Sequence, residues 1–482
     1  MDTRLALQQL YSETFGTEPS AIVPLRQSGS NRQYFRIQGN SESVIGTYGN
    51  DVSENKAFFY LTKHFTTKNI PVPRLIAVSA DNYFYLQEDI GDTSLFSLIE
   101  QSHKEGKTYS PVIENYFKKV IEQLVLLQRE ASGGINFRLC YPYHSFGIDS
   151  VLYDLRYFVF YFAKIFDLNY NELFLEKEFK RFAALLVADS NTCFMYRDFQ
   201  SRNIFIKNSE VVFIDYQAGR KGPPQYDLAS LLYQAKAMIP ENKRKELLEF
   251  YLDLSGIIDR HDRQEFTRKY YMVVCVRLLQ TLGAYGLRGI IEQKNHFIQS
   301  IPPAISNLKN MLPVFDLKKS FPEMHNLLLQ ATEISGLDEA TSEQSTSKLN
   351  VLVHSFSYKK GAPRDYSGNG GGFIFDCRGL LNPGKLNEYS PLTGNDKEVI
   401  RFLNNETEAN QIVANACKIV AVNIDSYIER NFKNLMIGFG CTGGRHRSVY
   451  CCNRLAKTLN KKYRDKIVIN VWHKELKIKY SL

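Results

Sequence analysis

The sequence predicts a two-lobed α+β domain followed by a smaller α/β domain. Strand-like segments gather near the N-terminus and long helical patterns follow them, which is the order expected of two lobes. After residue 349, strands and helices alternate, which favours an α/β sheet. A polar stretch without aromatic residues separates the two regions, and 482 residues exceed one ordinary domain. We therefore expect domains at 1–334 and 349–482, joined by a linker at 335–348.

The first region is expected to begin with a β-rich lobe. Its N-terminal 16 residues have the pattern of an amphipathic helix, and short apolar segments with turn glycines between them predict strands. Long helical patterns continue to about Phe182 and resume from Pro223 to Gln330. The expected strands are 34–37, 43–48, 72–78 and 83–88, with a helix over 52–65.

The second region alternates between strands and helices. The expected strands are 349–356, 372–376, 435–440 and 467–472, and the expected helices are 412–431 and 448–459. Ligands of such sheets bind at the carboxyl ends of the strands. The residues that follow position 440 are therefore a candidate site.

Composition excludes several classes of protein. The 44% hydrophobic and 23% charged residues are typical of a globular chain. No run approaches the roughly 20 apolar residues of a membrane helix, and the N-terminal helix pattern carries charges, unlike a signal peptide. Eight cysteines without a C-x-x-C pair favour buried thiols over a zinc site. We expect a cytoplasmic protein with no membrane partner.

The positive charge is concentrated after residue 348. That part contains 21 basic and 11 acidic residues, so it accounts for the whole net charge of +9. An anionic partner is therefore expected there. The basic C-terminal stretch could bind RNA through phosphate contacts, and an ordinary solvated surface is an equal alternative.

Three polar residues flank two short apolar runs within 193–220. Asn203 follows Asp198 by five residues, and Asp215 comes directly after the second run. Kinase-type phosphoryl transfer needs a carboxylate that accepts the hydroxyl proton, and an amide and a second carboxylate that hold Mg²⁺. A hairpin would bring Asn203 and Asp215 side by side, which predicts a phosphotransferase. The expected strands of this hairpin are 204–207 and 211–214.

Three further stretches carry a family resemblance. Residues 222–232, GPPQYDLASLL, match a G-P-x-x-Y-D-L-x-S-L-L motif; residues 25–36, LRQSGSNRQYFR, resemble a nucleotide-covering turn; and residues 87–92, QEDIGD, resemble a hinge. On these motifs, residues 1–330 resemble the aminoglycoside/choline phosphotransferase family, especially its cell-wall amino-sugar kinases acting on N-acetylmuramate and N-acetylglucosamine. The resemblance implies a protein-kinase-like fold with ATP as the phosphoryl donor and GTP as an alternative.

The same resemblance assigns expected roles to individual residues. It makes Asp198 the catalytic base and Asn203 and Asp215 the Mg²⁺ ligands, and it gives Asp227 the structural role of bracing the catalytic loop. The expected nucleotide-binding residues lie in the turn, in the first long helix and in the hinge: Ser30, Arg32, Glu54, Glu88 and Asp89.

The first region departs from the family pattern at two positions. Tyr196 stands where a histidine usually precedes Arg-Asp. The strand expected at 43–48 lacks the lysine that pairs with nucleotide phosphates in protein kinases, although its helix partner is present as Glu54. A pseudokinase therefore stays open as an alternative, although the amino-sugar branch often lacks this lysine.

A glycine-rich loop, 440–448, follows an expected strand and opens an expected helix. Backbone amides, a helix N-terminus and polar side chains would converge there to bind an anion. Cys441 and Arg447 also have the C-x5-R spacing of cysteine phosphatases, but no clear loop with an aspartic general acid is present. The expected phosphate-binding residues are Thr442, Gly443, Gly444, His446, Arg447 and Ser448, with Lys360 and Arg378 on neighbouring strand ends.

The second region resembles the C-terminal domain of the RapZ family. The matching stretches are 355–363, 375–383, 391–394 and 440–450. The resemblance implies binding of glucosamine 6-phosphate and small RNAs. The Walker A loop of that family's own N-terminal domain is missing, and the kinase-like region takes its place.

These observations predict an Mg²⁺-dependent transfer of the nucleotide γ-phosphate to a hydroxyl of a small sugar, with an amino sugar favoured. The second domain would act as a sugar-phosphate sensor on the same chain. Two alternatives stay open: a pseudokinase-type regulator that binds small RNA or an amino-sugar phosphate, and a sugar nucleotidyltransferase.

Overall fold

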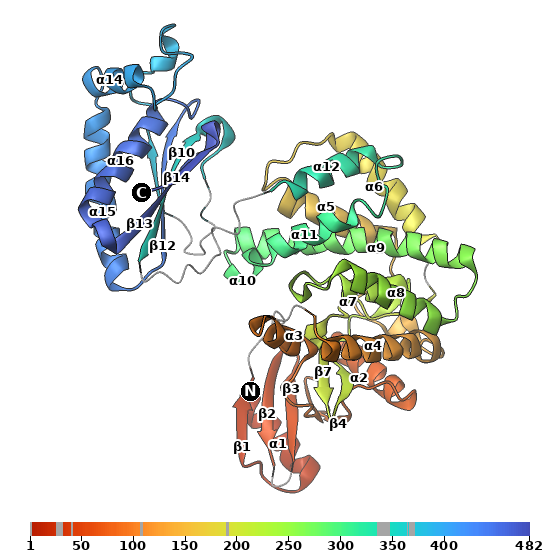
Figure 1. Cartoon of the computed structure of the whole chain (residues 1–482). Helices are drawn as coiled ribbons and strands as arrows, with labels where there is room; N and C mark the ends of the chain where they lie inside the picture. The colour runs from red at the N-terminus through yellow and green to blue at the C-terminus, as the bar shows by residue number, and fades with distance from the viewer. Residues whose placement is uncertain are drawn as a thin grey trace. The chain divides into compact units, whose positions relative to one another are not determined.

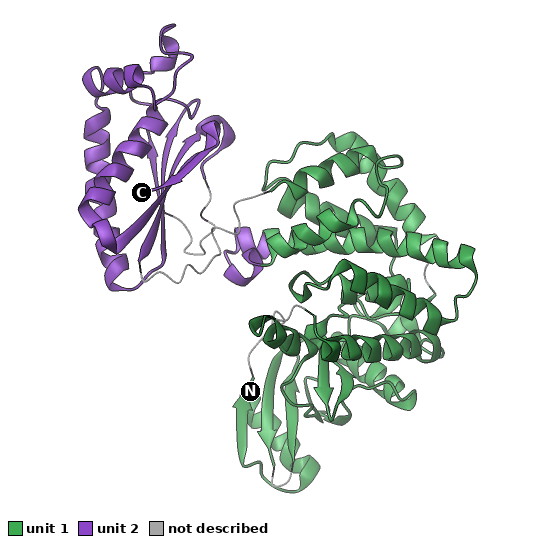
Figure 2. Cartoon of the chain, viewed as in Figure 1, with its two compact units in different colours: residues 1–286, 300–334 green, residues 287–299, 335–482 purple. Residues whose placement is uncertain are grey.

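The chain divides into two compact units in a computed structural model. The first contains residues 1–286 and 300–334, and the second contains 287–299 and 335–482 (Figure 2). Most of the expected linker lies outside the described residues, so the boundaries at 334 and 349 remain predictions. The structure describes residues 2–25, 32–39, 42–106, 109–188, 192–334, 348–363, 365 and 372–482.

The first unit opens with a five-stranded antiparallel sheet in the order β1-β2-β3-β5-β4 (Figure 1). Helix α1 (Thr3–Phe15) packs on this sheet through Leu7 and Leu10, which share a core with Ile37 of β2. The expected strands are confirmed, whereas β1, with only four residues and a proline, was not predicted. The strands are β1 (Ala21–Pro24), β2 (Gln33–Gln38), β3 (Ser43–Tyr48), β4 (Leu75–Val78) and β5 (Phe84–Glu88).

Helix α2 (Val52–Thr67) follows β3, as predicted. The side chain of Asp51 caps it by accepting hydrogen bonds from the backbone N–H groups of Ser53 and Glu54. This cap fixes where the helix begins, and therefore sets the position of Glu54 in its first turn.

A helical lobe completes the first unit. Its longest helix, α9 (Arg260–Tyr285), is buried on most sides over its central turns and forms the axis of the lobe. The other helices are α3 (Leu95–Lys104), α4 (Pro111–Leu126), α5 (Ile148–Phe158), α6 (Glu172–Val187), α7 (Gln225–Leu232), α8 (Glu241–Ser255), α11 (Ile301–Met311) and α12 (Pro322–Thr332). The short α10 (Asn295–Ile298) falls in the part of the chain grouped with the second unit.

Two small antiparallel pairs lie within this lobe. Strand β6 (Cys193–Met195) pairs with β9 (Arg220–Gly222), and β7 (Ile204–Lys207) pairs with β8 (Glu210–Phe213). The two-residue turn between β7 and β8 is Asn208–Ser209, and both residues have positive φ, at 52° and 64°. Such a turn matches the twist of the flanking strands and fixes their register.

The second unit is an α/β sheet in the order β11-β12-β10-β13-β14. Three of the four pairings in this sheet are parallel, and the fourth, between β13 and β14, is antiparallel. Inward residues of β10 and β12 share one core with apolar residues of α15 and α16, and Figure 1 shows the helices on one side of the strands. The elements are β10 (Leu349–Ser357), β11 (Gly372–Asp376), α14 (Lys397–Asn405), α15 (Ala409–Glu429), β12 (Asn434–Cys441), α16 (Arg447–Tyr463), β13 (Ile467–His473) and β14 (Ile478–Ser481).

Two general expectations can be compared with the structure. Among the described helices, not one combines the length and the apolar character that crossing a bilayer demands. All eight cysteines are free thiols, and all except the half-buried Cys417 are buried. The prediction of buried thiols is therefore confirmed.

Candidate active site and anion-binding loop

Asn203 connects the loop after β6 to the end of the β7–β8 hairpin. Its Nδ2 donates to the carbonyl oxygen of Asp198 at 2.9 Å and to Oδ2 of Asp215 at 3.3 Å. Gln217 donates to the other carboxylate oxygen of Asp215 at 2.8 Å. The three residues singled out from the sequence are therefore brought together. Asp215 has a φ of 71°, a left-handed conformation that non-glycine residues adopt mainly at functional sites and tight turns.

Asp227 stabilises the loop that carries Asp198. This fully buried carboxylate, near the start of α7, accepts hydrogen bonds from the backbone N–H groups of Tyr196 at 2.7 Å and Arg197 at 2.9 Å. Burial raises the pKa of Asp227 to about 7, and the two backbone N–H groups oppose the rise. Arg197 has a φ of 82°, so Asp227 stabilises a left-handed residue directly before Asp198. The expected bracing role of Asp227 is confirmed.

Tyr196 fills the position where the family pattern has a histidine. Its ring is buried against Phe199 and Phe213, and its hydroxyl donates to the carbonyl oxygen of Ile214. The tyrosine therefore ties the loop of Asp198 to the residue before Asp215. Although a tyrosine departs from the family pattern here, its contact links the segments that carry the Asp198 and Asp215 carboxylates.

The oxygen atoms around Asp215 suit a magnesium ion. With Nδ2 of Asn203 committed to two oxygens, its Oδ1 is the atom available as a ligand, beside the Asp215 carboxylate. The surrounding protein and the Asp198 carboxylate raise the pKa of Asp215, and a bound divalent cation would reverse that effect. No cluster of three or more His, Cys, Asp and Glu ligands was found among the described residues, so an Asp–Asn pair completed by substrate oxygens is the candidate.

Arg32 approaches the first turn of α2. Its Nη2 lies 3.6 Å from Oε1 of Glu54 and 3.3 Å from Oδ1 of Asn55, and only 4% of the residue is exposed. Arg32 is also among the groups that oppose the raised pKa of Asp215, so its guanidinium lies within electrostatic reach of the candidate metal ligands. Arg32 thus gives Glu54 a cationic partner although β3 has no lysine. The predicted Ser30 lies outside the described residues.

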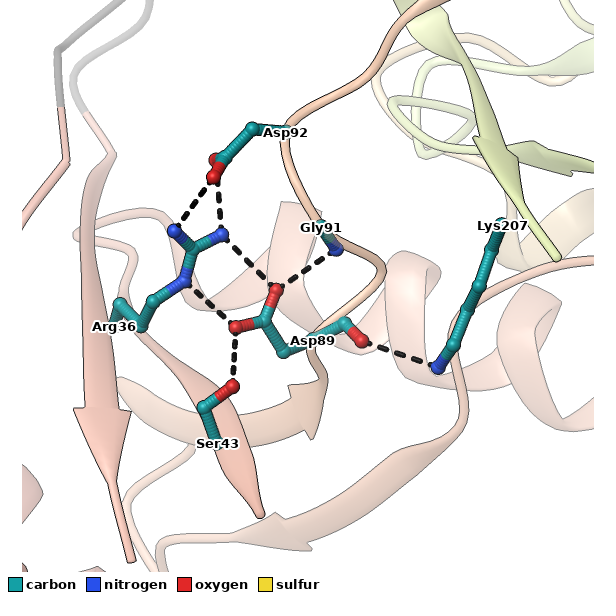
Figure 3. Close-up of polar contacts among 6 residues, drawn as sticks. All are labelled: Arg36, Ser43, Asp89, Gly91, Asp92 and Lys207. Atoms are coloured by element: carbon teal, nitrogen blue, oxygen red, sulfur yellow. Dashed lines mark hydrogen bonds and ion pairs between the residues drawn. The ribbon is translucent and has the colours of Figure 1, made fainter.

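The predicted hinge residues use their carboxylates inside the protein (Figure 3). Asp89 accepts from Arg36 Nε at 2.7 Å, from Ser43 Oγ at 2.7 Å and from the N–H of Gly91 at 3.0 Å. Lys207 of β7 donates to the carbonyl oxygen of Asp89 at 3.2 Å and to Oε1 of Glu88 at 2.6 Å. Any contact of Glu88 or Asp89 with a nucleotide would therefore come from backbone atoms.

The glycine-rich loop of the second unit runs from the end of β12 to the start of α16. The buried Sγ of Cys441 accepts a hydrogen bond from the N–H of Gly444 at 3.2 Å and lies 3.2 Å from Ser448 Oγ. Gly444 has a φ of 68°, and a Cβ there would lie 2.9 Å from the backbone nitrogen of Ser357. Only glycine therefore fits this position.

Three of the predicted side chains of this loop have partners within the second unit. Arg447 is 4% exposed and donates to the carbonyl oxygens of Arg378 at 3.0 Å and Leu380 at 2.9 Å, so it closes the loop against a neighbouring segment. His446 contacts the carbonyl oxygen of Tyr389 at 3.1 Å, and Ser448 is buried against Cys441. Nη2 of Arg447 also donates to Thr442 Oγ1 within the loop at 3.4 Å, and the phosphate-binding roles of these residues stay predictions.

The two predicted helper residues also have partners. Lys360 lies 2.8 Å from Oε2 of Glu475, and Arg378 lies 2.7 Å from Oδ2 of Asp376 with its guanidinium over the ring of Tyr358. The exposed part of the loop is instead formed by Thr442, Gly443 and Arg445. Sequence reasoning omitted Arg445, although it stands within the same motif.

The geometry does not favour a cysteine phosphatase. Cys441 is 2% exposed, whereas a nucleophilic thiolate must reach a substrate phosphorus. The exposed residues Thr442, Gly443 and Arg445 fit the predicted non-catalytic anion site, which stays a prediction.

Two family models match the chain. A model described as "Phosphotransferase enzyme family" matches residues 21–266, and a model described as "RapZ C-terminal domain" matches residues 349–477. Together they confirm the two resemblances drawn from the sequence, and the first unit has the expected kinase-like fold.

Curated relatives and solved structures give further matches. A nucleotide-binding protein of Glaesserella parasuis is 37% identical over 126 residues, which is 26% of this chain and 42% of that protein. One from Fervidobacterium nodosum is 26% identical over 262 residues, 52% of this chain and 87% of that protein. The chain thus spans less than half of the first relative.

The structural matches are distant. An ethanolamine kinase of Plasmodium vivax has a TM-score of 0.44 at 15% identity, covering 62% of this chain and 84% of that chain. A choline kinase of Cryptosporidium parvum has a TM-score of 0.43 at 14% identity, covering 65% and 98%.

Proposed function

Because the chain belongs to the phosphotransferase enzyme family through residues 21–266, we propose that its first unit transfers the γ-phosphoryl group of ATP to a hydroxyl of a small sugar. The observation that carries the proposal is the hydrogen-bonded group of Asp198, Asn203 and Asp215. A carboxylate beside an amide–carboxylate metal pair is the minimum that in-line phosphoryl transfer requires.

Each residue of this group would have its own role in the phosphoryl transfer. Asp198 has a half-exposed side chain and would accept the proton of the acceptor hydroxyl. Asn203 and Asp215 would hold Mg²⁺, which when bound neutralises charge on the nucleotide phosphates. Asp227 and Tyr196 would keep the base and the metal ligands in fixed relation.

The Arg32–Glu54 contact supports activity over a pseudokinase. In protein kinases a lysine paired with a helix glutamate holds the nucleotide phosphates. Arg32 would supply that cation from the start of β2, since its Nη2 lies 3.6 Å from Glu54. A guanidinium can donate two parallel hydrogen bonds to a phosphate, so the exchange of lysine for arginine keeps the function.

The second unit would bind a sugar phosphate at its glycine-rich loop. The RapZ C-terminal domain match and the exposed residues Thr442, Gly443 and Arg445 support this proposal. An amino sugar is favoured as the acceptor because both family resemblances point to amino-sugar metabolism, which is an analogy rather than a chemical reading of the site.

A substrate panel tests the phosphotransferase proposal. ATP turnover would be measured with sugars, amino sugars, aminoglycosides and choline, with and without Mg²⁺, on the wild type and on Asp198→Ala. We expect Mg²⁺-dependent turnover with a sugar, a kcat about 10²–10⁴-fold lower in Asp198→Ala, and nearly unchanged nucleotide binding. The exposed Asp149→Asn variant in the first turn of α5 serves as the control. Flat turnover across the panel would favour a regulatory pseudokinase.

An RNA-binding regulator is the second candidate. Lys474 and Lys479 lie 5.4 Å and 4.8 Å from the ring centroid of Trp472, so a half-buried aromatic ring carries two cations at the surface of the second unit. Such a surface suits a nucleic-acid backbone. The test is RNA binding at several salt concentrations, with Lys474→Gln and Lys479→Gln expected to reduce both affinity and its salt dependence.

A further inference from the structure

Three arginines lie on or beside the segment that leads to Asp198. Arg197 precedes it in the chain, Arg277 of α9 brings Nη2 to 3.9 Å from Asp198 Oδ1, and Arg220 lies in β9 opposite Met195. The pKa of Arg220 is lowered to about 10 by burial and by the charge of Arg197, so these two groups are close neighbours. A cluster of like charges this close to a candidate base requires an explanation.

Among the described residues, no carboxylate accepts a hydrogen bond from the guanidinium groups of Arg197, Arg220 or Arg277. Arg277 donates to the hydroxyl of Tyr226 at 3.1 Å and to Gln280 at 3.0 Å, and Arg220 donates only to the carbonyl oxygen of Ala218. The carboxylate contact of Arg197 is Asp154 Oδ1 at 3.9 Å, beyond hydrogen-bond distance. Arg220 also lies over the ring of Tyr143 at 4.9 Å and Arg277 over the ring of Tyr226 at 5.1 Å, so their close contacts are with neutral groups.

Among the described residues, the nearby carboxylates form no hydrogen bond with Arg220. Asp227 is used by two backbone N–H groups, and Asp198 must stay available to take a proton. Asp154, which is 1% exposed, can compensate one guanidinium. Arg220 is 2% exposed, and its Nη1 has no hydrogen-bond partner in the described part of the chain. Burying an uncompensated guanidinium is costly, and this cost is recovered if a ligand supplies an anion.

The position of the cluster indicates which ligand. Arg32 lies near Glu54 and acts electrostatically on Asp215, where the nucleotide phosphates and Mg²⁺ would bind, whereas Arg277 lies 3.9 Å from Asp198, which the acceptor hydroxyl must reach. In an in-line transfer the acceptor approaches from the opposite side. The Arg197 side chain is 24% exposed, so it is accessible to a ligand.

We propose that the acceptor carries an anionic group, a carboxylate or a phosphate, beside the hydroxyl that is phosphorylated, and that Arg197 and Arg220 bind this group. The inference rests on the proposed phosphotransferase function and narrows its substrate class. Bidentate contacts from guanidinium to an oxyanion would also orient the hydroxyl toward Asp198. Arg277, held by Tyr226 and Gln280, is a positioning residue for the base.

Acceptor pairs that differ in one anionic group test the proposal. The full-length protein would be assayed with ATP and Mg²⁺ on glucosamine against glucosamine 6-phosphate, N-acetylglucosamine against N-acetylmuramate, and glucose against glucuronate. We expect kcat/KM to be at least tenfold higher for the anionic sugar than for its neutral partner, either in the phosphate pair or in the carboxylate pairs. Which pairs show the difference identifies the anionic group that is recognised. Equal kcat/KM within every pair would overturn the inference.

Substitution of Arg197 provides the second readout. Arg197→Gln should raise KM for the anionic acceptor at least tenfold more than KM for its neutral counterpart, since a charged hydrogen bond is lost, and should leave the KM for ATP unchanged. Arg156→Gln, on the same helix as Asp154 and in an exposed ion pair with Glu176, is the matched control. Equal losses for neutral and anionic acceptors would show that Arg197 only shapes the loop. If neutral and anionic sugars react equally well and both reactions depend on Asp198, only the inference about an anionic acceptor is wrong. If no acceptor reacts, the proposed phosphotransferase function is wrong as well.

Discussion

Asn203 donates a hydrogen bond to the carboxylate of Asp215 across 3.3 Å. The β7–β8 hairpin produces this contact, because its turn residues Asn208 and Ser209 both adopt positive φ and set Ile204 opposite Phe213. A shift of the pairing by one residue would turn these side chains to the other face. The register of one short hairpin therefore decides whether an amide and a carboxylate meet beside Asp198.

Loss of Glu54 is expected to weaken nucleotide binding. Glu54→Gln removes the charge that faces the buried Arg32 guanidinium and so frees that side chain to move. The KM for ATP should rise about tenfold, which corresponds to roughly 1.5 kcal/mol for one charged interaction. Steady-state kinetics over ATP concentration measure this change, with Glu42→Gln as an exposed control in the same lobe.

Arg32 itself should tolerate lysine better than alanine. Arg32→Lys keeps a cation near Glu54, whereas Arg32→Ala leaves that carboxylate without it. Partial retention of kcat/KM in the lysine variant and loss in the alanine variant would support a role with phosphates. Equal activity of both variants and the wild type would remove Arg32 from the nucleotide site.

The sequence was informative where local pattern decides structure. The strands at 43–48 and 372–376 have the predicted bounds, and the expected meeting of Asn203 and Asp215 is confirmed. These elements have strong alternation or strict turn chemistry, so few competing arrangements exist. Short elements such as β1 and β14 were not predicted, because four residues carry too little pattern.

Side-chain direction was harder to predict than position. The motif of Arg447 correctly indicated a loop between a strand and a helix, but its guanidinium binds the carbonyl oxygens of Arg378 and Leu380, about 70 residues earlier in the chain. Arg32 was expected at the nucleotide, yet its contact with Glu54 depends on how β2 lies against α2. Such contacts depend on tertiary packing, which a single sequence does not specify.

Asp89 and Asp92 offer a matched pair for a stability test. Both contact Arg36, but the Asp89 side chain is 8% exposed and also binds Ser43 and Gly91, whereas the Asp92 side chain is 78% exposed (Figure 3). Asp89→Asn should lower the free energy of unfolding of the first unit by about 1–3 kcal/mol. Asp92→Asn should change it by less than about 0.5 kcal/mol. Urea unfolding followed by far-ultraviolet circular dichroism measures the free energy of unfolding of both variants. Equal changes in the two variants would contradict a stabilising role of the buried Asp89 side chain at the hinge.

Acid is expected to destabilise the second unit. Burial, with smaller effects of Lys474 and Lys479, lowers the pKa of His354 to about 3, and burial lowers the pKa of His473 to about 4. In the unfolded chain both histidines titrate near 6.5, so between about pH 6.5 and 4 the unfolded state binds more protons. The stability is therefore fully present above pH 6.5 and is lost as the pH falls toward the folded values.

Tryptophan fluorescence of the full-length protein measures the pH dependence of the stability of the second unit. Trp472 is the one tryptophan of the chain and lies 5.3 Å from the His354 ring, between centroids. The urea midpoint of its fluorescence should fall from pH 7 to pH 5, and His354→Phe should reduce that fall. A midpoint that stays constant over this range would show that neither histidine is buried in neutral form.

The glycine-rich loop of the second unit should bind glucosamine 6-phosphate without hydrolysing it. Its exposed tip offers the backbone amides of Thr442 and Gly443 and the side chain of Arg445, whereas Cys441 is buried and hydrogen-bonded. Calorimetric titration of the full-length protein should show binding that falls about tenfold in Arg445→Gln. Cys441→Ser keeps a polar atom that can accept from the N–H of Gly444, so its affinity should stay within about threefold of the wild type. Phosphate release from the ligand, present in the wild type and absent in Cys441→Ser, would instead identify a phosphatase and would require the loop to open around the sulfur.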